Sequence, residues 1–175
     1  MRPGVRKLVL SVHLTVSVGW IGAAAAYLAL DVATATTNDP PVLRAAYLGM
    51  DLILRSVIVP LAVATLISGI VISLGTRWGL FRHYWVVISL ALTVLATVVL
   101  LSETRTVSAL ARVAADPSTT AEQLAVLHNT LVHSIGGILL LGAILVLNVY
   151  KPRGVTRYGW RKQQASRKGA PARKA

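Results

Sequence analysis

Four runs of apolar residues, separated by short polar stretches, organise this chain. They cover about residues 8–30, 52–74, 85–102 and 121–150. Because an α-helix rises about 1.5 Å per residue, runs of this length can cross the hydrocarbon core of a bilayer. The pattern predicts an all-α fold, a bundle of four transmembrane helices.

The polar stretches between the runs are expected to form short amphipathic helices on the membrane surface and tight turns. One such helix covers residues 42–50 after a Pro-containing turn, and another lies within residues 103–120. Thr119 and Glu122 have the spacing of a capping box. This pair predicts that the fourth helix begins near residue 121.

The last 25 residues differ in composition from the rest of the chain. Residues 151–175 contain nine Lys and Arg, no acidic residue, and scattered Gly, Pro and Ala. Such a segment cannot build a hydrophobic core. We therefore expect a membrane domain at 1–150 and a disordered basic tail at 151–175, with Tyr158 and Trp160 near the membrane interface.

Composition agrees with a membrane protein and narrows its chemistry. The 175 residues are 55% hydrophobic and 14% charged, with a mean hydropathy of +0.66, which excludes an ordinary soluble domain. The lack of Cys excludes disulfides and thiolate metal sites, and two Met offer few ligands for copper. Because half of the basic residues lie in the tail, the net charge of +12 indicates contact with the bilayer and its anionic lipid headgroups, and not with nucleic acid.

Charge also predicts the orientation in the membrane. Residues 1–7, 75–84 and the tail lie on one side and carry three, two and nine Lys or Arg, whereas all six acidic residues lie on the other. The positive-inside rule then places both termini in the cytoplasm of a multi-pass protein of the cytoplasmic membrane. The first run resembles a signal peptide, but its length and its polar His13 favour a retained span.

His13 is the one ionisable residue of the first run. Counting about 1.5 Å per residue places it about 9 Å from the edge at Lys7 and places Ser89 about 10 Å from the edge at Arg82. The two residues therefore share a level on the inner side. The candidate inner site contains His13, Ser17, Trp20, Trp85 and Ser89, with His13 as the metal ligand. The alternative is a packing histidine that holds two helices together.

A second polar group is expected near the outer side. Asp51 and Arg55 are four residues apart and predict a local ion pair on one helix face. Asn129 and His133 complete this candidate outer cluster. His133 lies about 16 Å from the level of His13, so the two cannot bind one metal ion. The sequence contains no catalytic or zinc-binding motif, and whether the protein is an enzyme is left open.

Three segments carry a resemblance to known proteins: His13 with the Gly-Trp-Ile-Gly at 19–22, GTRWGLFRHYWVV at 75–87, and VYKPRGVTRYGWRKQ at 149–163. The chain resembles an uncharacterised family of small bacterial integral-membrane proteins, a domain of unknown function. It is more distantly similar to the copper-resistance D proteins and to the four-helix protoporphyrinogen oxidase that binds haem b. That resemblance implies haem b at His13, whereas the functional lysine of the oxidase corresponds here to Ser89.

Three hypotheses follow. The first is an auxiliary or redox membrane protein that binds haem b at His13. The second is a porphyrin-oxidising membrane enzyme, and the third is a small transporter or a subunit of a larger complex that uses the outer cluster. Small residues on several helices also permit a homodimer or a partner membrane subunit.

Overall fold

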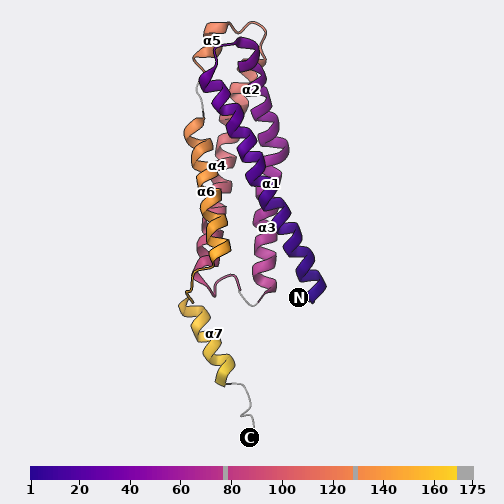
Figure 1. Ribbon diagram of the computed structural model, residues 1–175, viewed down its shortest axis with the longest axis vertical. Helices are drawn as coiled ribbons and strands as arrows, with labels where there is room; N and C mark the ends of the chain where they lie inside the picture. Colours follow the sequence, from indigo (N-terminus) through magenta and orange to yellow (C-terminus); the bar gives the residue numbers. More distant parts are fainter. Residues whose placement is uncertain (77–78, 128–129, 169–175) are drawn as a thin grey trace.

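The protein is a bundle of long helices. The computed structural model describes residues 1–76, 79–127 and 130–168. Within these residues four helical segments are long and apolar enough to cross a membrane, and no strand is present beyond an isolated bridge between His83 and Val155. The segments are Pro3–Thr36 (α1), Pro40–Gly75, Tyr84–Ala115 (α4) and Leu131–Tyr150 (α6) (Figure 1). The predicted all-α transmembrane bundle is confirmed, and the protein is an integral membrane protein.

The second segment is one continuous helix with an irregular centre. It comprises α2 (Pro40–Ile53), a π-helical turn at Leu54–Ile58 and α3 (Val59–Gly75). The π turn ends two residues before Pro60, whose missing N–H interrupts the regular hydrogen-bond ladder. The separate surface helix predicted at 42–50 was therefore wrong. One face of this stretch is instead buried in the bundle core, with Leu43 1% and Met50 0% exposed.

The third and fourth segments also depart from the predicted boundaries. Residues 103–115 continue α4 without a break because one face, including Val107 and Ala114, is buried. The capping box is formed by Thr120 and Gln123, one residue later than predicted, and it begins only the short helix α5 (Ala121–Ala125). The fourth span starts later, at Leu131.

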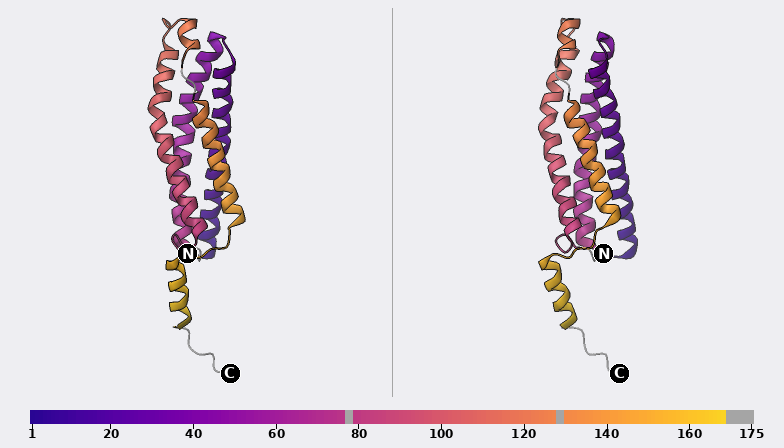
Figure 2. Two further views of the ribbon diagram at one scale, coloured as in Figure 1. Left: turned by 90° about the vertical axis from the view of Figure 1, so that its left-hand side faces the viewer. Right: turned by 60° about the vertical axis from the view of Figure 1, so that its left-hand side comes forward.

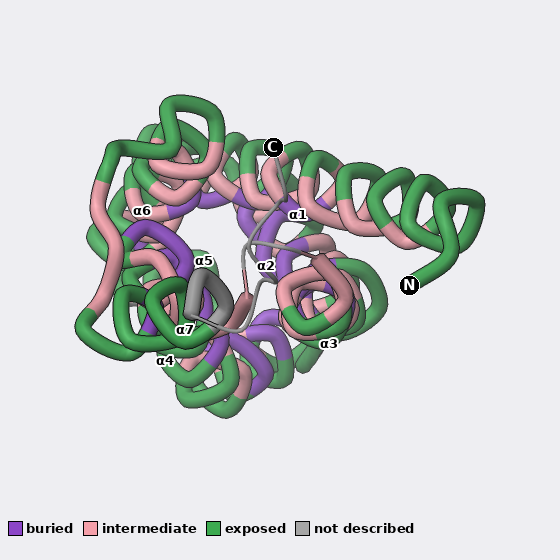
Figure 3. Tube along the Cα trace, turned by 90° about the horizontal axis from the view of Figure 1, so that it is seen from below, coloured by how far each residue is buried: buried purple, intermediate pink, exposed green. Residues whose placement is uncertain are grey.

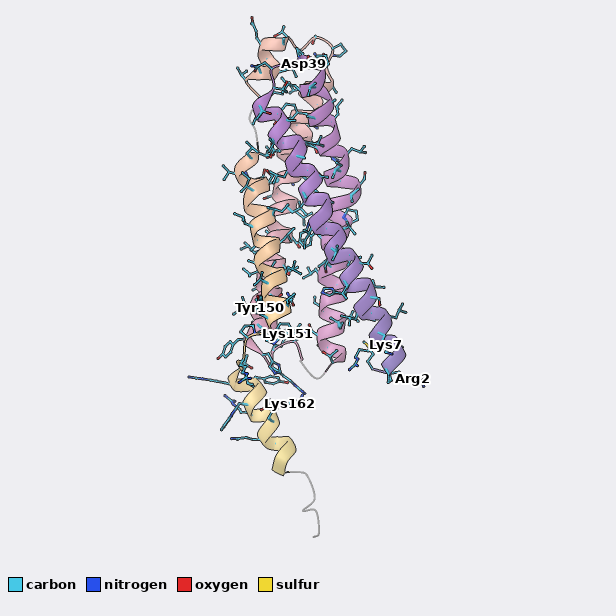
Figure 4. The ribbon with its side chains drawn as sticks, in the orientation of Figure 1. Arg2, Lys7, Asp39, Tyr150, Lys151 and Lys162 are labelled. Carbon is cyan, nitrogen blue, oxygen red and sulfur yellow. The ribbon has the colours of Figure 1, made fainter. Side chains whose placement is uncertain are left out.

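The two ends of the bundle differ in charge. Arg2, Lys7, Lys151 and Lys162 lie at the end where α1 begins and α6 ends, and Asp39 lies at the opposite end (Figure 4). We call these the basic end and the acidic end. The first span therefore begins, and the last span ends, at the same end of the bundle, as an even number of membrane crossings requires.

The hydrophobic core is concentrated toward the acidic end. α6 has 20 residues, about the number needed to cross the hydrocarbon core, whereas α1 and α4 have 34 and 32. The longer helices extend past α6 at the acidic end (Figure 2). The side chains buried there belong to α2, α4 and α5 and are Leu43, Tyr47, Met50, Val107, Ala114 and Leu124. This packing stabilises the part of the bundle that extends past α6.

Packing is looser toward the basic end. α1 has no buried residue before Trp20, and Leu141 is the one buried residue of α6. Seen along the bundle, the beginning of α1 lies far from α6 (Figure 3), and the two helices diverge toward the basic end (Figure 1). Below them, Arg157–Lys168 form a further helix, α7. The predicted disorder of the tail was therefore wrong for this stretch, and residues 169–175 lie outside the described part.

Candidate functional site

His13 lies on α1 where this helix meets α3. Its Nδ1 atom is 2.9 Å from the hydroxyl oxygen of Ser68, 55 positions later in the chain. A Cβ added at Gly69 would be 3.2 Å from Cε1 of the same ring. The absence of a side chain at Gly69 therefore lets the imidazole lie against the α3 backbone.

The partners of Ser68 determine which nitrogen of His13 carries the proton. The Ser68 hydroxyl donates to the carbonyl of Ala64 at 2.6 Å, and the carbonyl of Thr65 is 3.2 Å away. A hydroxyl has one proton, so Ser68 accepts from His13 Nδ1–H. In the neutral ring Nε2 then carries a lone pair, which is the form that binds a metal ion.

Polar side chains continue across the interior at the basic half of the bundle. On α4, Thr93 and Thr97 are buried and donate to carbonyls of their own helix at 2.8 Å. On α3, the Thr65 hydroxyl is buried and has no hydrogen-bond partner among the described residues. A buried hydroxyl without a partner is costly, which marks this region as one that a polar group of a ligand or a water molecule would complete.

Among the described contacts, none of the other residues predicted to surround His13 forms a hydrogen bond with its imidazole ring. Ser17 donates to the carbonyl of His13 at 2.6 Å, within α1, and Trp20 is 4% exposed in the hydrophobic core. Trp85 is buried near the start of α4. Ser89 accepts a hydrogen bond from Asn148 of α6 at 2.6 Å. The hydrogen bonds thus link His13 to Ser68, a residue that the sequence analysis did not include.

The predicted ion pair of the outer cluster is present. Arg55 Nε lies 2.9 Å from Asp51 Oδ1, and the guanidinium also donates to the buried hydroxyl of Ser108 on α4. That hydroxyl lies 2.6 Å from the same Asp51 oxygen. Because Arg55 is in the π-helical turn, this three-residue network ties the irregular part of the second span to α4.

His133, the histidine of the predicted outer cluster, contacts an acidic residue of α4. Its Nε2 atom lies 3.5 Å from Oε1 of Glu103, so the contact links α6 to α4 and becomes an ion pair when the imidazole is protonated. Asn129 lies outside the described residues. The structure thus pairs Asp51 with Arg55 and pairs His133 with Glu103.

A fully buried acidic side chain, that of Asp31, was missed by the sequence analysis, which ended the first apolar run at residue 30. It is 0% exposed and lies on α1. Its oxygens accept from the backbone N–H of Thr130 at 3.2 Å, from the Thr130 hydroxyl at 2.9 Å and from the Ser134 hydroxyl at 2.7 Å. No Lys, Arg or His among the described residues forms an ion pair with it. Neutral donors at the start of α6 therefore satisfy the oxygens of this carboxyl group.

One sequence signal could have found Asp31. The inward face of α1 contains Trp20 and Tyr27, both buried, and Asp31 follows Tyr27 by four residues on the same face. The Tyr27 hydroxyl lies 3.1 Å from the Thr130 hydroxyl. The helical period thus continues past the point where hydropathy suggested that the span ends.

These contacts define two polar regions: the His13 region in the basic half and a layer near the start of α6 that contains Asp31. Among the described residues no three His, Cys, Asp or Glu come together as a metal site. The His13 region therefore offers a single protein ligand to a metal. No family model, curated protein or solved structure matches the chain.

Proposed function

We propose that this integral membrane protein binds haem b, which Nε2 of His13 would hold, and works as an auxiliary or redox protein. The observation that supports this most directly is the hydrogen bond from His13 Nδ1 to Ser68, which orients the ring and leaves the lone pair on Nε2. Haem needs one protein ligand, whereas a zinc or copper site needs several. When bound, haem b would supply a centre for one-electron transfer.

The charges along α1 suit the carboxylates of such a group. Arg6 precedes His13 by seven residues, about two helical turns, and therefore lies on the same face about 10 Å nearer the basic end. Arg2 adds a second positive charge at the N-cap of α1. α1 has no buried residue before Trp20, so this part of the helix is open to contact from a ligand.

The distribution of charge suggests the orientation of the bundle. Because Lys and Arg gather at the basic end, we infer that this end faces the cytoplasm of a bacterial cell, with the protein in the cytoplasmic membrane. A reporter enzyme active only outside the cytoplasm, fused within the connection at residues 37–39, should be active. The same reporter after residue 150 should be inactive.

The haem proposal is tested by an absorption spectrum and a pyridine haemochromogen assay on detergent-purified protein made with ample haem supply. We expect a Soret band with close to one haem per chain. His13→Ala should lose the haem and keep its helical circular dichroism. Ser68→Ala should lower haem affinity by about ten- to a hundredfold, because it removes the group that orients the ligand.

A matched control is Ser102→Ala, because the exposed Ser102 hydroxyl also donates to a carbonyl of its own helix, that of Val99 at 2.7 Å. It should retain the haem. Haem content unchanged by His13→Ala would refute the assignment of the ligand. Turnover of protoporphyrinogen by the loaded protein would favour the porphyrin-oxidising alternative. A colourless protein that purifies with another membrane subunit would favour a role as a transporter or a subunit of a complex.

A further inference from the structure

The first part of the basic tail is fixed to the bundle. Thr156 donates its backbone N–H to the carbonyl of Arg82 at 3.0 Å and its hydroxyl to the carbonyl of Phe81 at 2.5 Å. Tyr84 donates its N–H to the carbonyl of Gly154 at 3.3 Å. These bonds join the segment that follows α6 to the segment that precedes α4, and they position the start of α7.

A glycine brings α7 close to this segment. A Cβ added at Gly159 would lie 2.4 Å from the carbonyl oxygen of Arg82, closer than real Cβ contacts. Gly159 is also buried, and its N–H donates to the Thr156 hydroxyl at 3.1 Å. The placement of α7 therefore depends on backbone packing and on specific hydrogen bonds.

An open pocket of about 290 Å³ lies where α7 meets the start of α4. Arg157 and Arg161 contribute to it from α7, four residues apart and hence on one helix face. Tyr84 and Trp160 add aromatic rings that are 52% and 59% exposed. The pocket thus combines two guanidinium groups with two amphipathic rings, at the level where α4 leaves the membrane.

The chain itself supplies no acidic side chain near these two arginines. The sequence has no Asp or Glu in residues 1–30, 52–102 or 123–175, and the acidic residues lie toward the other end of the bundle. Guanidinium groups bind phosphate oxygens through paired hydrogen bonds. Tyr and Trp are common at the level of lipid headgroups.

We propose that this pocket binds the phosphate of an anionic phospholipid headgroup in the leaflet at the basic end, and so anchors α7 to the membrane surface. Inorganic phosphate has the same oxygens but no acyl chains. The lipid is favoured because Tyr84 begins a membrane span, so the pocket opens where headgroups lie. This site does not include His13, so its test and the test of the haem proposal are independent of each other.

The test is a lipid titration of the full-length protein in detergent, followed by native mass spectrometry. Phosphatidylglycerol, phosphatidylcholine and inorganic phosphate are the three probes. We expect saturable binding of phosphatidylglycerol that is about tenfold tighter than that of phosphatidylcholine. The double variant Arg157→Gln/Arg161→Gln should weaken it about tenfold, in line with the attraction of two basic residues to anionic lipid.

The matched control is Arg167→Gln/Lys168→Gln, which removes the same charge from the far end of α7. It should change the affinity for phosphatidylglycerol less than twofold. Equal losses in the two double variants would mean that net charge alone attracts the lipid, and would overturn the pocket. Binding of inorganic phosphate as tight as that of phosphatidylglycerol would overturn the assignment to a lipid.

Discussion

Thr130 donates both its backbone N–H and its hydroxyl to the carboxylate of Asp31, a residue 99 positions earlier in the chain. Because α6 begins at the next residue, Leu131, the carboxylate of one helix caps the N-terminus of another. The partial positive charge of that terminus stabilises the anion. This contact fixes the end of α1 to the start of the last span.

Asp31→Ala should destabilise the protein strongly for a single change. The substitution leaves the N–H of Thr130 and the hydroxyls of Thr130 and Ser134 without their acceptor in a buried place, at a cost of about 2 kcal/mol. Asp31→Asn retains one carbonyl acceptor and should cost less. Thermal unfolding followed by circular dichroism in detergent should rank the unchanged protein as the most stable, then Asp31→Asn, then Asp31→Ala.

The matched control for that experiment is Asp39→Ala. Asp39 is exposed and makes no side-chain hydrogen bond at the start of α2. Its replacement should leave the unfolding temperature within about a degree, since surface substitutions change stability little. If Asp31→Ala were as stable as Asp39→Ala, the cap at α6 would have no energetic role.

Arg44 is the second residue whose loss should have a large effect, here on the local stability of the chain at the end of α4. Its guanidinium donates to the backbone carbonyls of Ala114 at 2.6 Å, Asp116 at 2.7 Å and Thr119 at 2.6 Å. It thereby satisfies carbonyls at the C-terminus of α4, where no helical partner exists. Arg44→Ala should speed amide hydrogen exchange in residues 113–125.

The control for Arg44 is Arg105→Ala, which removes an equal charge from an exposed position on the same α4. Exchange in residues 113–125 should then match that of the unchanged protein. Faster exchange in both variants would indicate a general effect of charge, and would contradict a specific role of Arg44 at the end of α4.

Hydropathy predicted the four spans because each is a local property of about twenty residues. It failed at residues 42–50 and 103–115, where moderately apolar faces pack against each other and the helices continue. It also failed at Asp31, because a polar residue after an apolar run suggests a loop until its partner is known. That partner, Thr130, lies in a segment with no sequence signal that points to Asp31.

In the candidate site, too, the sequence predicted the local features and not the contacts between distant residues. The inward face of α1 that contains His13 and Trp20 follows from helical periodicity. Ser68 is an unremarkable residue of an apolar run, and only the packing of α1 on α3 brings it to the imidazole. The Asp51–Arg55 pair was predicted because its spacing is local, whereas the third member, Ser108, lies 57 residues from Asp51.

The turn after α4 should show a pH-dependent stability. The pKa of the Asp116 carboxyl lies below its ordinary value of 3.8, because the Ser118 hydroxyl and then the Ser118 N–H donate to it, and Arg44 is near. A depressed pKa in the folded state stabilises the turn above the ordinary pKa. This contribution is lost as the pH falls through the lower pKa of the folded state.

A carboxyl carbon NMR titration of the folded protein checks this sign. Its midpoint for Asp116 should lie below 3.8. Ser118→Ala removes the hydroxyl donor and should move the midpoint upward, whereas Ser102→Ala, at a distant position on α4, should leave it unchanged. A midpoint above 3.8 in the unchanged protein would contradict the hydrogen-bond geometry of the turn.

Two glycines near α7 provide a matched pair of substitutions. Gly159→Ala should displace α7, because its Cβ would lie 2.4 Å from a backbone oxygen of Arg82, which cannot move aside as a side chain can. Gly154→Ala should be tolerated, since its nearest neighbour would be a ring carbon of Tyr84 at an ordinary 3.4 Å.

Hydrogen exchange at the amides of Thr156 and Trp160 measures the difference between the two variants. Both amides donate to backbone carbonyls in the unchanged protein, so exchange should become much faster in Gly159→Ala and stay slow in Gly154→Ala. Slow exchange in both variants would mean that α7 does not need close contact with Arg82 to stay in place.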